Sequence, residues 1–385
     1  MLRRLSLLVR RIAGKSVAAR LLLVPGIVPL RGFVRDGASA ARLEKEFCPR
    51  WYSLRYPDVK AGGLDPLIHY LAYGQSEGRQ PSPWVPPGHD LVQTAENPAT
   101  PPVRITALFL RYGSERYPGA LARFRSLLSI RFSEAQIWTV LVDNALPPDY
   151  CEYLTDEGVT AIGGDNSSWE FSGWQKALEW SEAVGGPPDW ILFATDAFDQ
   201  LYIEFLQHFS TGLLQRLVTY PVALGHLDSY NEAVTAFGRT AQHWIRTSFF
   251  VVRAEDARKL GHLHTVTAPA EIFAGNPQAP FLAHSPVDHK LQGYITGWLT
   301  GPGTGQGVAW HSRFDLNPET LPYFEAKAIA ILNEFSLSAR LAELGIRLLD
   351  VTWARSAGSD LPNKLDTHWR AQIDGRFQPG HGETA

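Results

Sequence analysis

Residues 159–178, VTAIGGDNSSWEFSGWQKAL, join a short apolar run to a segment with helical spacing through a polar turn. The first six residues are small, apolar or β-branched, which is typical of a buried strand. From Phe171 onward, apolar residues recur every three or four positions, and this spacing predicts an amphipathic helix. The junction gathers an amide, an indole and a carboxylate: Asn166, Trp169 and Glu170.

The same order of strand and helix is repeated on both sides of this stretch. Expected strands lie at 104–112, 135–144, 159–164 and 189–196, and expected helices at 117–130, 147–158, 171–184 and 200–217. Such alternation predicts an α/β fold, in which a mostly parallel sheet is flanked by helices on both faces.

The C-terminal part predicts a strand and a helix over 247–261 and strong helices over 319–349. We therefore expect one α/β domain to span residues 103–355. The residues after it, 356–385, are predicted to form a flexible tail because they end in the polar, glycine-containing sequence FQPGHGETA.

The charge of the chain is unevenly distributed. The net charge of −3 argues against nucleic acid as a partner of the whole chain. Residues 1–35 nevertheless carry eight Arg or Lys and no acid, so the remaining 350 residues carry −11. One helical face of this start is apolar: Leu2, Leu5, Val9 and Ile12. Residues 1–36 are therefore predicted to lie on an anionic membrane surface or, with equal weight, to be a disordered basic tail.

Two cysteines, Cys48 and Cys151, suggest neither a disulfide framework nor a metal site of the CxxC type. A reducing compartment fits this usage. We expect a cytoplasmic protein, peripheral at the inner face of the cytoplasmic membrane.

Residues 42–86 form a separate unit of two short helices joined at AGGLDP, and the proline-rich residues 87–102 form a linker. The sequence YPDVKAGGLDPLIHYLAYGQSEGRQPSP (56–83) resembles a small module that recurs in bacterial glycosyltransferases and other cell-surface polysaccharide proteins. Cys48 stands where that module usually has Asp. A structural or docking role is the favoured interpretation.

Polar residues follow the expected strands at the end where parallel α/β sheets bind ligands. Arg111 follows the first strand, Asp143 and Asn144 the second, Asp165 and Asn166 the third, and Asp196 the fourth. An acid at the end of the second strand can bond a ribose or a base, and one at the end of the fourth can hold a divalent cation. Neither a P-loop nor a strand-linked G-x-G-x-x-G is present.

Three segments resemble the nucleotide-sugar half of GT-A-fold, family-2 glycosyltransferases, nearest the branch related to rhamnan synthesis protein F. They are VLVDNA (140–145), GGDNSSWEFSGWQKAL (163–178) and DWILFATDAF (189–198). The last occupies the place of the metal-binding DxD motif, but Ala194 replaces the first acid. One carboxylate can still hold a cation when a diphosphate supplies other oxygens.

The resemblance implies transfer of a sugar from a nucleotide-sugar donor to a saccharide or lipid-linked acceptor in polysaccharide or lipopolysaccharide synthesis. The donor site would comprise Arg111, Asp143, Asn144, Asp165, Asn166, Trp169, Glu170 and Asp196. Asp196 and His311 would hold Mg²⁺ or Mn²⁺. Asp196 as a helix cap is the simpler alternative, and for Trp174 and Phe171 a core position is favoured.

An inverting transferase needs a carboxylate that deprotonates the acceptor hydroxyl. Asp288 is the preferred candidate and Glu271 the second, although Asp288 also suits the N-cap of a helix. Two other functions stay open. The missing acid favours a non-catalytic, carbohydrate-binding or scaffolding protein. A nucleotidyltransferase shares the logic of the strand ends, but LRYGSERYPG (110–119) is a poor version of its start.

Overall fold

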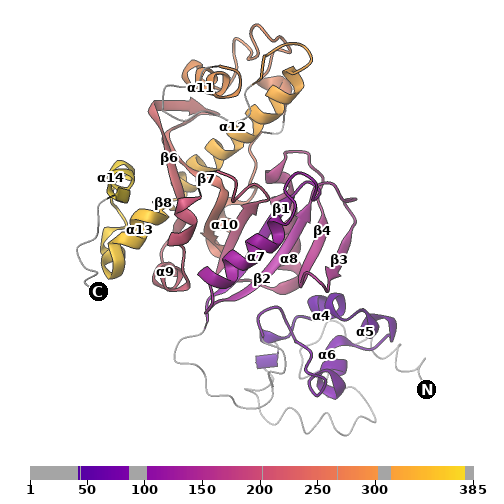
Figure 1. Cartoon of the computed structure of the whole chain (residues 1–385). Helices are drawn as coiled ribbons and strands as arrows, with labels where there is room; N and C mark the ends of the chain where they lie inside the picture. The colour runs from indigo at the N-terminus through magenta and orange to yellow at the C-terminus, as the bar shows by residue number, and fades with distance from the viewer. Residues whose placement is uncertain are drawn as a thin grey trace.

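The computed structural model describes residues 42–43, 45–85, 102–201, 203–266, 268–301 and 314–377 (Figure 1). The basic segment 1–36, nearly all of the linker and His311 lie outside these ranges. Within them, no helix is long and apolar enough to cross a membrane.

An eight-stranded sheet forms the centre of the described chain, in the order β3-β4-β2-β1-β5-β7-β6-β8 (Figure 1). Its strands are β1 (Arg104–Arg111), β2 (Gln136–Asp143), β3 (Cys151–Leu154), β4 (Val159–Gly163), β5 (Trp190–Thr195), β6 (Val222–Ala236), β7 (Arg239–Arg253) and β8 (Arg347–Asp350). Strands β4, β2, β1 and β5 are parallel, whereas β7 runs antiparallel to both β5 and β6. The predicted α/β class is confirmed.

Helices flank both faces of the sheet because side chains alternate along each strand. Ile105, Ala107 and Phe109 of β1 face one core, and Leu108 and Leu110 face the other. The first core is covered by α7 (Ala120–Arg131), α9 (Thr211–Leu217) and α13 (Val351–Ala357). The second is covered by α8 (Glu170–Gly185), α10 (Ala254–Leu260) and α12 (Leu321–Glu343).

A third core lies beyond the sheet, where the ends of β6 and β7 pack against α11 (His289–Leu299) and the start of α12. Figure 1 shows these helices at the top of the view. The shorter helical segments are α4 (Pro49–Arg55), α5 (Pro57–Ala61), α6 (Pro66–His69), η2 (Tyr70–Gly74), η3 (Glu204–His208), η4 (Pro269–Glu271), η5 (Gly358–Lys364), α14 (Trp369–Asp374) and η6 (Gly375–Phe377).

Two expected helices are wrong or broken. The helix expected over 147–158 is instead the strand β3, which pairs antiparallel with β4. Prolines precede β3, and a turn that contains Gly158, at a φ of 62°, follows it. The segment between them is too short for a helix but suits an edge strand. The helix expected over 200–217 divides into η3 and α9 because Ser210 is extended and caps α9.

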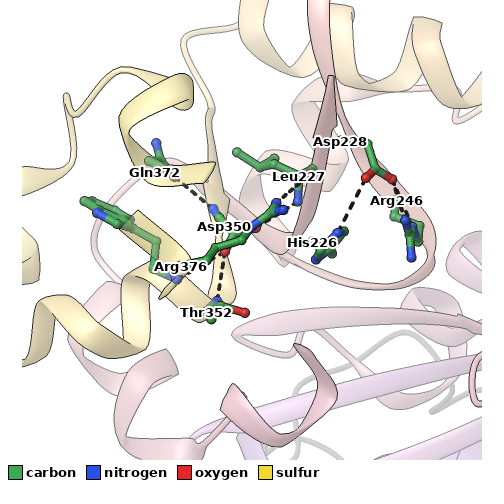
Figure 2. Close-up of polar contacts among 9 residues, drawn as sticks. His226, Leu227, Asp228, Arg246, Asp350, Thr352, Gln372 and Arg376 are labelled. Atoms are coloured by element: carbon green, nitrogen blue, oxygen red, sulfur yellow. Dashed lines mark hydrogen bonds and ion pairs between the residues drawn. The ribbon is translucent and has the colours of Figure 1, made fainter. Parts of the chain in front are cut away.

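The tail prediction is wrong for residues 356–377, which form η5, α14 and η6. Figure 2 shows what fastens them: the buried Asp350 accepts hydrogen bonds from Leu227 N (3.0 Å) and from Arg376 Nε (2.8 Å). Gln372 Oε1 in turn accepts from Asp350 N at 2.9 Å. A buried carboxylate needs such partners, and they order the chain that supplies them.

The described part of the module, residues 45–85, has its own small core, built largely from the motif residues. Arg79 pairs with Asp58 at 2.9 Å, and Tyr52 Oη lies 3.1 Å from His69 Nδ1. The module docks on the domain through Trp84, whose Nε1 donates to Gly185 O at 2.8 Å. This contact lies at the amino end of the parallel strands, below the sheet in Figure 1.

Candidate functional site

The connections between strands diverge at the carboxyl ends of β1 and β5. From β1 the chain passes to β2 and β4 on one side of the sheet and then returns to β5 on the other side. Ligands of open α/β sheets bind where the connections diverge in this way. Tyr112, 63% exposed, follows β1 here, and Asp196 follows β5.

Arg111 and Asp143 are occupied with each other. Arg111 Nε lies 2.6 Å from Asp143 Oδ2, and the backbone N–H groups of Gly113 and Ala145 donate to Asp143 Oδ1 at 2.9 and 3.0 Å. Asp143 is buried and its oxygens already accept three hydrogen bonds. The pair therefore fixes the loop after β1 and leaves little capacity for a ligand.

Asn144 holds the loop between β4 and α8. Its Nδ2 donates to Asn166 Oδ1 at 3.1 Å and to Trp169 O at 2.9 Å. Its Oδ1 is buried without a hydrogen-bond partner among the described residues. A Cβ at Gly164 would lie 1.8 Å from that oxygen, so this close approach requires glycine.

Two residues of the loop between β4 and α8 have backbone angles that are unusual for residues with a side chain. Asn166 has a φ of 54°, and Trp169 has a φ of 53° with a ψ of −126°. The latter region is nearly reserved for glycine and costs on the order of 1–3 kcal/mol. Asn144 and Ser172 Oγ, at 2.9 and 3.2 Å from Trp169 O, hold this residue in place. Such strain is concentrated at ligand-binding sites.

Glu170 begins α8 and Asp196 follows β5, and the charge of Asp196 acts on Glu170. Burial raises the pKa of Glu170 to about 7, and the carboxylates of Glu334 and Asp196 add to this while the Lys327 ammonium opposes it. Burial likewise raises the pKa of Asp196 to about 6, against the Tyr112 N–H and the Arg116 charge. Two desolvated carboxyl groups that repel each other favour binding of a cation or a proton.

Helix α12 completes the wall of the site where β5 ends. Beyond Thr195, strand β7 has lost its partner on this side. Glu334 Oε1 accepts from Thr247 N at 2.7 Å, and Ser338 Oγ accepts from Ile245 N at 3.0 Å. Burial raises the pKa of Glu334, although Thr247 partly offsets it. The helix thus replaces the missing strand and brings a third carboxyl group, that of Glu334, near Glu170.

Three charged or titratable side chains on β6 and β7 interact with one another, and the sequence analysis did not predict them. Figure 2 shows Asp228 between His226 and Arg246. His226 Nε2 lies 3.5 Å from Asp228 Oδ1, and Arg246 Nη2 lies 2.8 Å from Oδ2. Burial opposes ionisation, but these two partners hold the pKa of Asp228 below its ordinary value. Residues two positions apart in a strand lie on the same face, so the spacing of His226 and Asp228 would have indicated this contact if β6 had been predicted.

Other predicted site residues lie apart from this group. Asp165 is exposed and accepts from Ser167 N in its own turn. Asp288 caps α11, with Oδ1 accepting from Leu291 N at 2.8 Å and Oδ2 accepting from Thr235 N at 2.5 Å. Glu271 is exposed on η4, and Trp174 is fully buried in the core, as favoured.

The metal prediction rests on Asp196 alone among the described residues, since His311 lies outside them. No three side chains of His, Cys, Asp or Glu in the described ranges are grouped to hold a metal ion by themselves. Asp196 still offers the hard oxygen that Mg²⁺ or Mn²⁺ prefers, so a diphosphate would have to supply further ligands.

No family model matches the sequence, and no curated protein matches it. Among solved structures, the chain is similar to the mannosyltransferase PcManGT from Pyrobaculum calidifontis in complex with GDP-Man and Mn²⁺. The identity is 12%, the match covers 84% of this chain and 94% of that one, and the TM-score is 0.30. A superposition this loose supports no conclusion about the site.

Proposed function

We propose that the protein is a glycosyltransferase that binds a nucleotide-sugar donor at the carboxyl edge of its sheet. The observation that carries this proposal is that Asp196 follows β5 where the strand connections diverge, and that Glu170, at the start of α8, lies close enough for the Asp196 charge to act on it. A bound cation or a reacting hydroxyl would use such groups. The resemblance of residues 140–198 to family-2 enzymes supports the same assignment.

Asp196 would hold Mg²⁺ or Mn²⁺ together with the donor diphosphate. Such a cation neutralises the charge that develops on a leaving diphosphate. Asn166 and Trp169 would bound the donor, and Arg111 with Asp143 would position the loop beside it. Asn144 Oδ1, buried and without a partner in the described chain, could accept a hydrogen bond from the donor.

We assign the base to Glu170 in preference to Asp288 and Glu271. A base that accepts a proton near neutral pH works best when its pKa lies in that range, and burial raises the pKa of Glu170 to about 7. Asp288 already accepts two backbone hydrogen bonds, and a base needs a free oxygen. The transferred group would be a hexosyl or deoxyhexosyl residue.

We also propose that the reaction serves polysaccharide or lipopolysaccharide synthesis at the cytoplasmic face of a membrane, as in the rhamnan synthesis protein F branch. The eight Arg or Lys of residues 1–35 support a peripheral attachment to anionic lipid. Deleting residues 1–35 should abolish binding to anionic vesicles but leave binding to neutral vesicles unchanged.

A thermal-shift screen tests the proposed activity. UDP-, GDP-, dTDP- and CMP-sugars are added with and without Mn²⁺ to the full chain, because a ligand of the native state raises its melting temperature. At least one donor should stabilise the wild type, and Asp196→Asn should remove the Mn²⁺-dependent part. Stabilisation by sugars alone, with no response to any nucleotide, would instead support a non-catalytic carbohydrate-binding protein, which the buried Ala194 in place of the first metal-binding acid favours.

A further inference from the structure

Lys327 is a charged residue near the site that has no carboxylate within ion-pair distance in the described part of the chain. Its Nζ lies 5.7 Å from the centre of the Trp169 ring and 5.4 Å from that of Tyr323. Three other described lysines do have carboxylate partners: Lys259, Lys290 and Lys364. A partly buried ammonium between two aromatic rings is held in place without being neutralised.

The two rings come from elements that the fold keeps rigid. Tyr323 and Lys327 are one turn apart on α12 and so lie on the same face of that helix. Trp169 is the strained N-cap residue of α8, held by Asn144 and Ser172. Tyr323 is 39% exposed, and an exposed ring offers a flat apolar face to a ligand.

The cluster lies beside the proposed base. Trp169, whose ring Lys327 contacts, directly precedes Glu170 in the chain, and the Lys327 ammonium is close enough to influence the Glu170 carboxyl group. In a transfer reaction the base contacts the acceptor hydroxyl, so groups beside the base are placed to contact the acceptor.

We propose that Tyr323 and Lys327 form the acceptor subsite, with Trp169 at its border with the donor, and that it takes a pyranose ring carrying an anionic group, either a carboxylate or a phosphate. The apolar face of the sugar stacks on an aromatic ring, and the anion pairs with the Lys327 ammonium. The acceptor role rests on the proposed transferase function, whereas the preference for anionic sugars does not.

The test is an NMR titration of the full chain with glucose, glucuronate and glucose 6-phosphate. The wild type should bind one or both anionic sugars at least about tenfold more tightly than glucose. Preference for glucuronate alone identifies a sugar carboxylate as the anion, and preference for the phosphate alone identifies a phosphate. Equal binding of all three sugars would overturn the proposal.

Two variants and a control locate the effect. Lys327→Met should reduce the affinity for the anionic sugars to that for glucose, and Tyr323→Ser should weaken all three. Lys364→Met, which removes an exposed lysine from η5, should change nothing. Full retention of the charge preference in Lys327→Met contradicts the proposal.

Titrations with UDP and GDP in the presence of Mn²⁺ separate the two proposals. If Lys327→Met weakens nucleotide binding as much as sugar binding, the lysine serves the donor phosphates and the acceptor assignment is wrong. If the wild type binds neither nucleotide yet still prefers anionic sugars through Lys327, the proposed transferase function fails while the anionic subsite stands.

Discussion

At the amino end of the sheet, Trp84 stacks edge-on against Trp138 at 6.0 Å and donates to Gly185 O. A Cβ on Gly185 would lie 2.1 Å from the Trp138 ring, so the contact is as close as a glycine allows. At the carboxyl end, Glu170 and Asp196 are desolvated without a strong partner, and Trp169 is strained. The amino end contributes stability, whereas the carboxyl end gives up stability to hold these groups, as expected of the proposed donor site.

Loss of Trp84 should have the largest effect and should act on stability alone. This side chain is 3% exposed, and Trp84→Ala should lower the free energy of unfolding by about 3–5 kcal/mol through the cavity it leaves. Urea denaturation measures this, with Tyr73→Ala, 56% exposed on the same module, as the control. A parallel loss of nucleotide affinity in the folded variant would show that the two ends are not independent.

Asp196→Asn should lower activity without lowering stability. Turnover, followed as release of the nucleoside diphosphate, should fall at least about 100-fold, which corresponds to about 2.7 kcal/mol of transition-state stabilisation. The stability of the unliganded protein should stay the same or rise, because the substitution removes a desolvated charge. Asp156→Asn, at an exposed position in the turn after β3, is the matched control. An unchanged turnover in Asp196→Asn excludes Asp196 from the mechanism.

The raised pKa of Glu170 makes stability depend on pH with a definite sign. Folding shifts the pKa from its ordinary 4.5 to about 7, so the folded protein binds this proton more tightly than the unfolded chain does. The resulting stabilisation is fully present below pH 4.5 and is lost as the pH rises through 7. The free energy of unfolding of Glu170→Gln should therefore rise relative to that of the wild type across this pH range, as measured by urea denaturation at successive pH values. We expect a difference of about 1–2 kcal/mol, which allows for screening by solvent.

Glu170→Gln must be compared with the wild type because buried histidines titrate in the same pH range and change the stability in the opposite direction. Burial lowers the pKa of His243 to about 4, for example. A constant difference between Glu170→Gln and the wild type from pH 4 to pH 8 would mean that the carboxyl group is solvated, and the contrast between the two ends of the sheet would weaken.

Asp288→Ala should have the smallest effect. Removing the N-cap of α11 should cost about 1 kcal/mol of stability, close to the cost of Ser210→Ala at the N-cap of α9. Turnover of the folded variant should be unchanged if Glu170 is the base. A loss of turnover larger than the loss of folded protein would return Asp288 to the catalytic site.

The parallel half of the sheet could be predicted because its strands are apolar runs bounded by polar turns. Strand β6 could not, since VALGHLDSYNEAVTA (222–236) has register shifts at Gly225/Leu227 and at Ser229/Val234 that break the alternation of a strand. β8 was merged with the preceding helix because four residues between two helices give little signal.

Asp196 was predictable as a candidate site residue because it directly follows β5, and Glu170 because it begins the helix after the polar loop that follows β4. Glu334 and Lys327 were not, since they come from a helix about 150 residues later in the chain, and no local pattern indicates which face of that helix lies near Glu170. Arg111 and Asp143 were predicted as donor ligands from position alone. Only the structure shows that they bond each other.

The pairing of β8 with β6 determines when this edge of the sheet can form during synthesis. β6 ends at residue 236, whereas β8 begins at residue 347, so a ribosome adds 111 residues before this edge of the sheet is closed. At about 5–20 residues per second this takes roughly 6–22 s. During that interval the newly made half presents an open strand edge and an uncovered apolar face, the two features that promote association between unfinished chains. This exposure therefore ends only when β8, far later in the chain than its partner β6, has been synthesised.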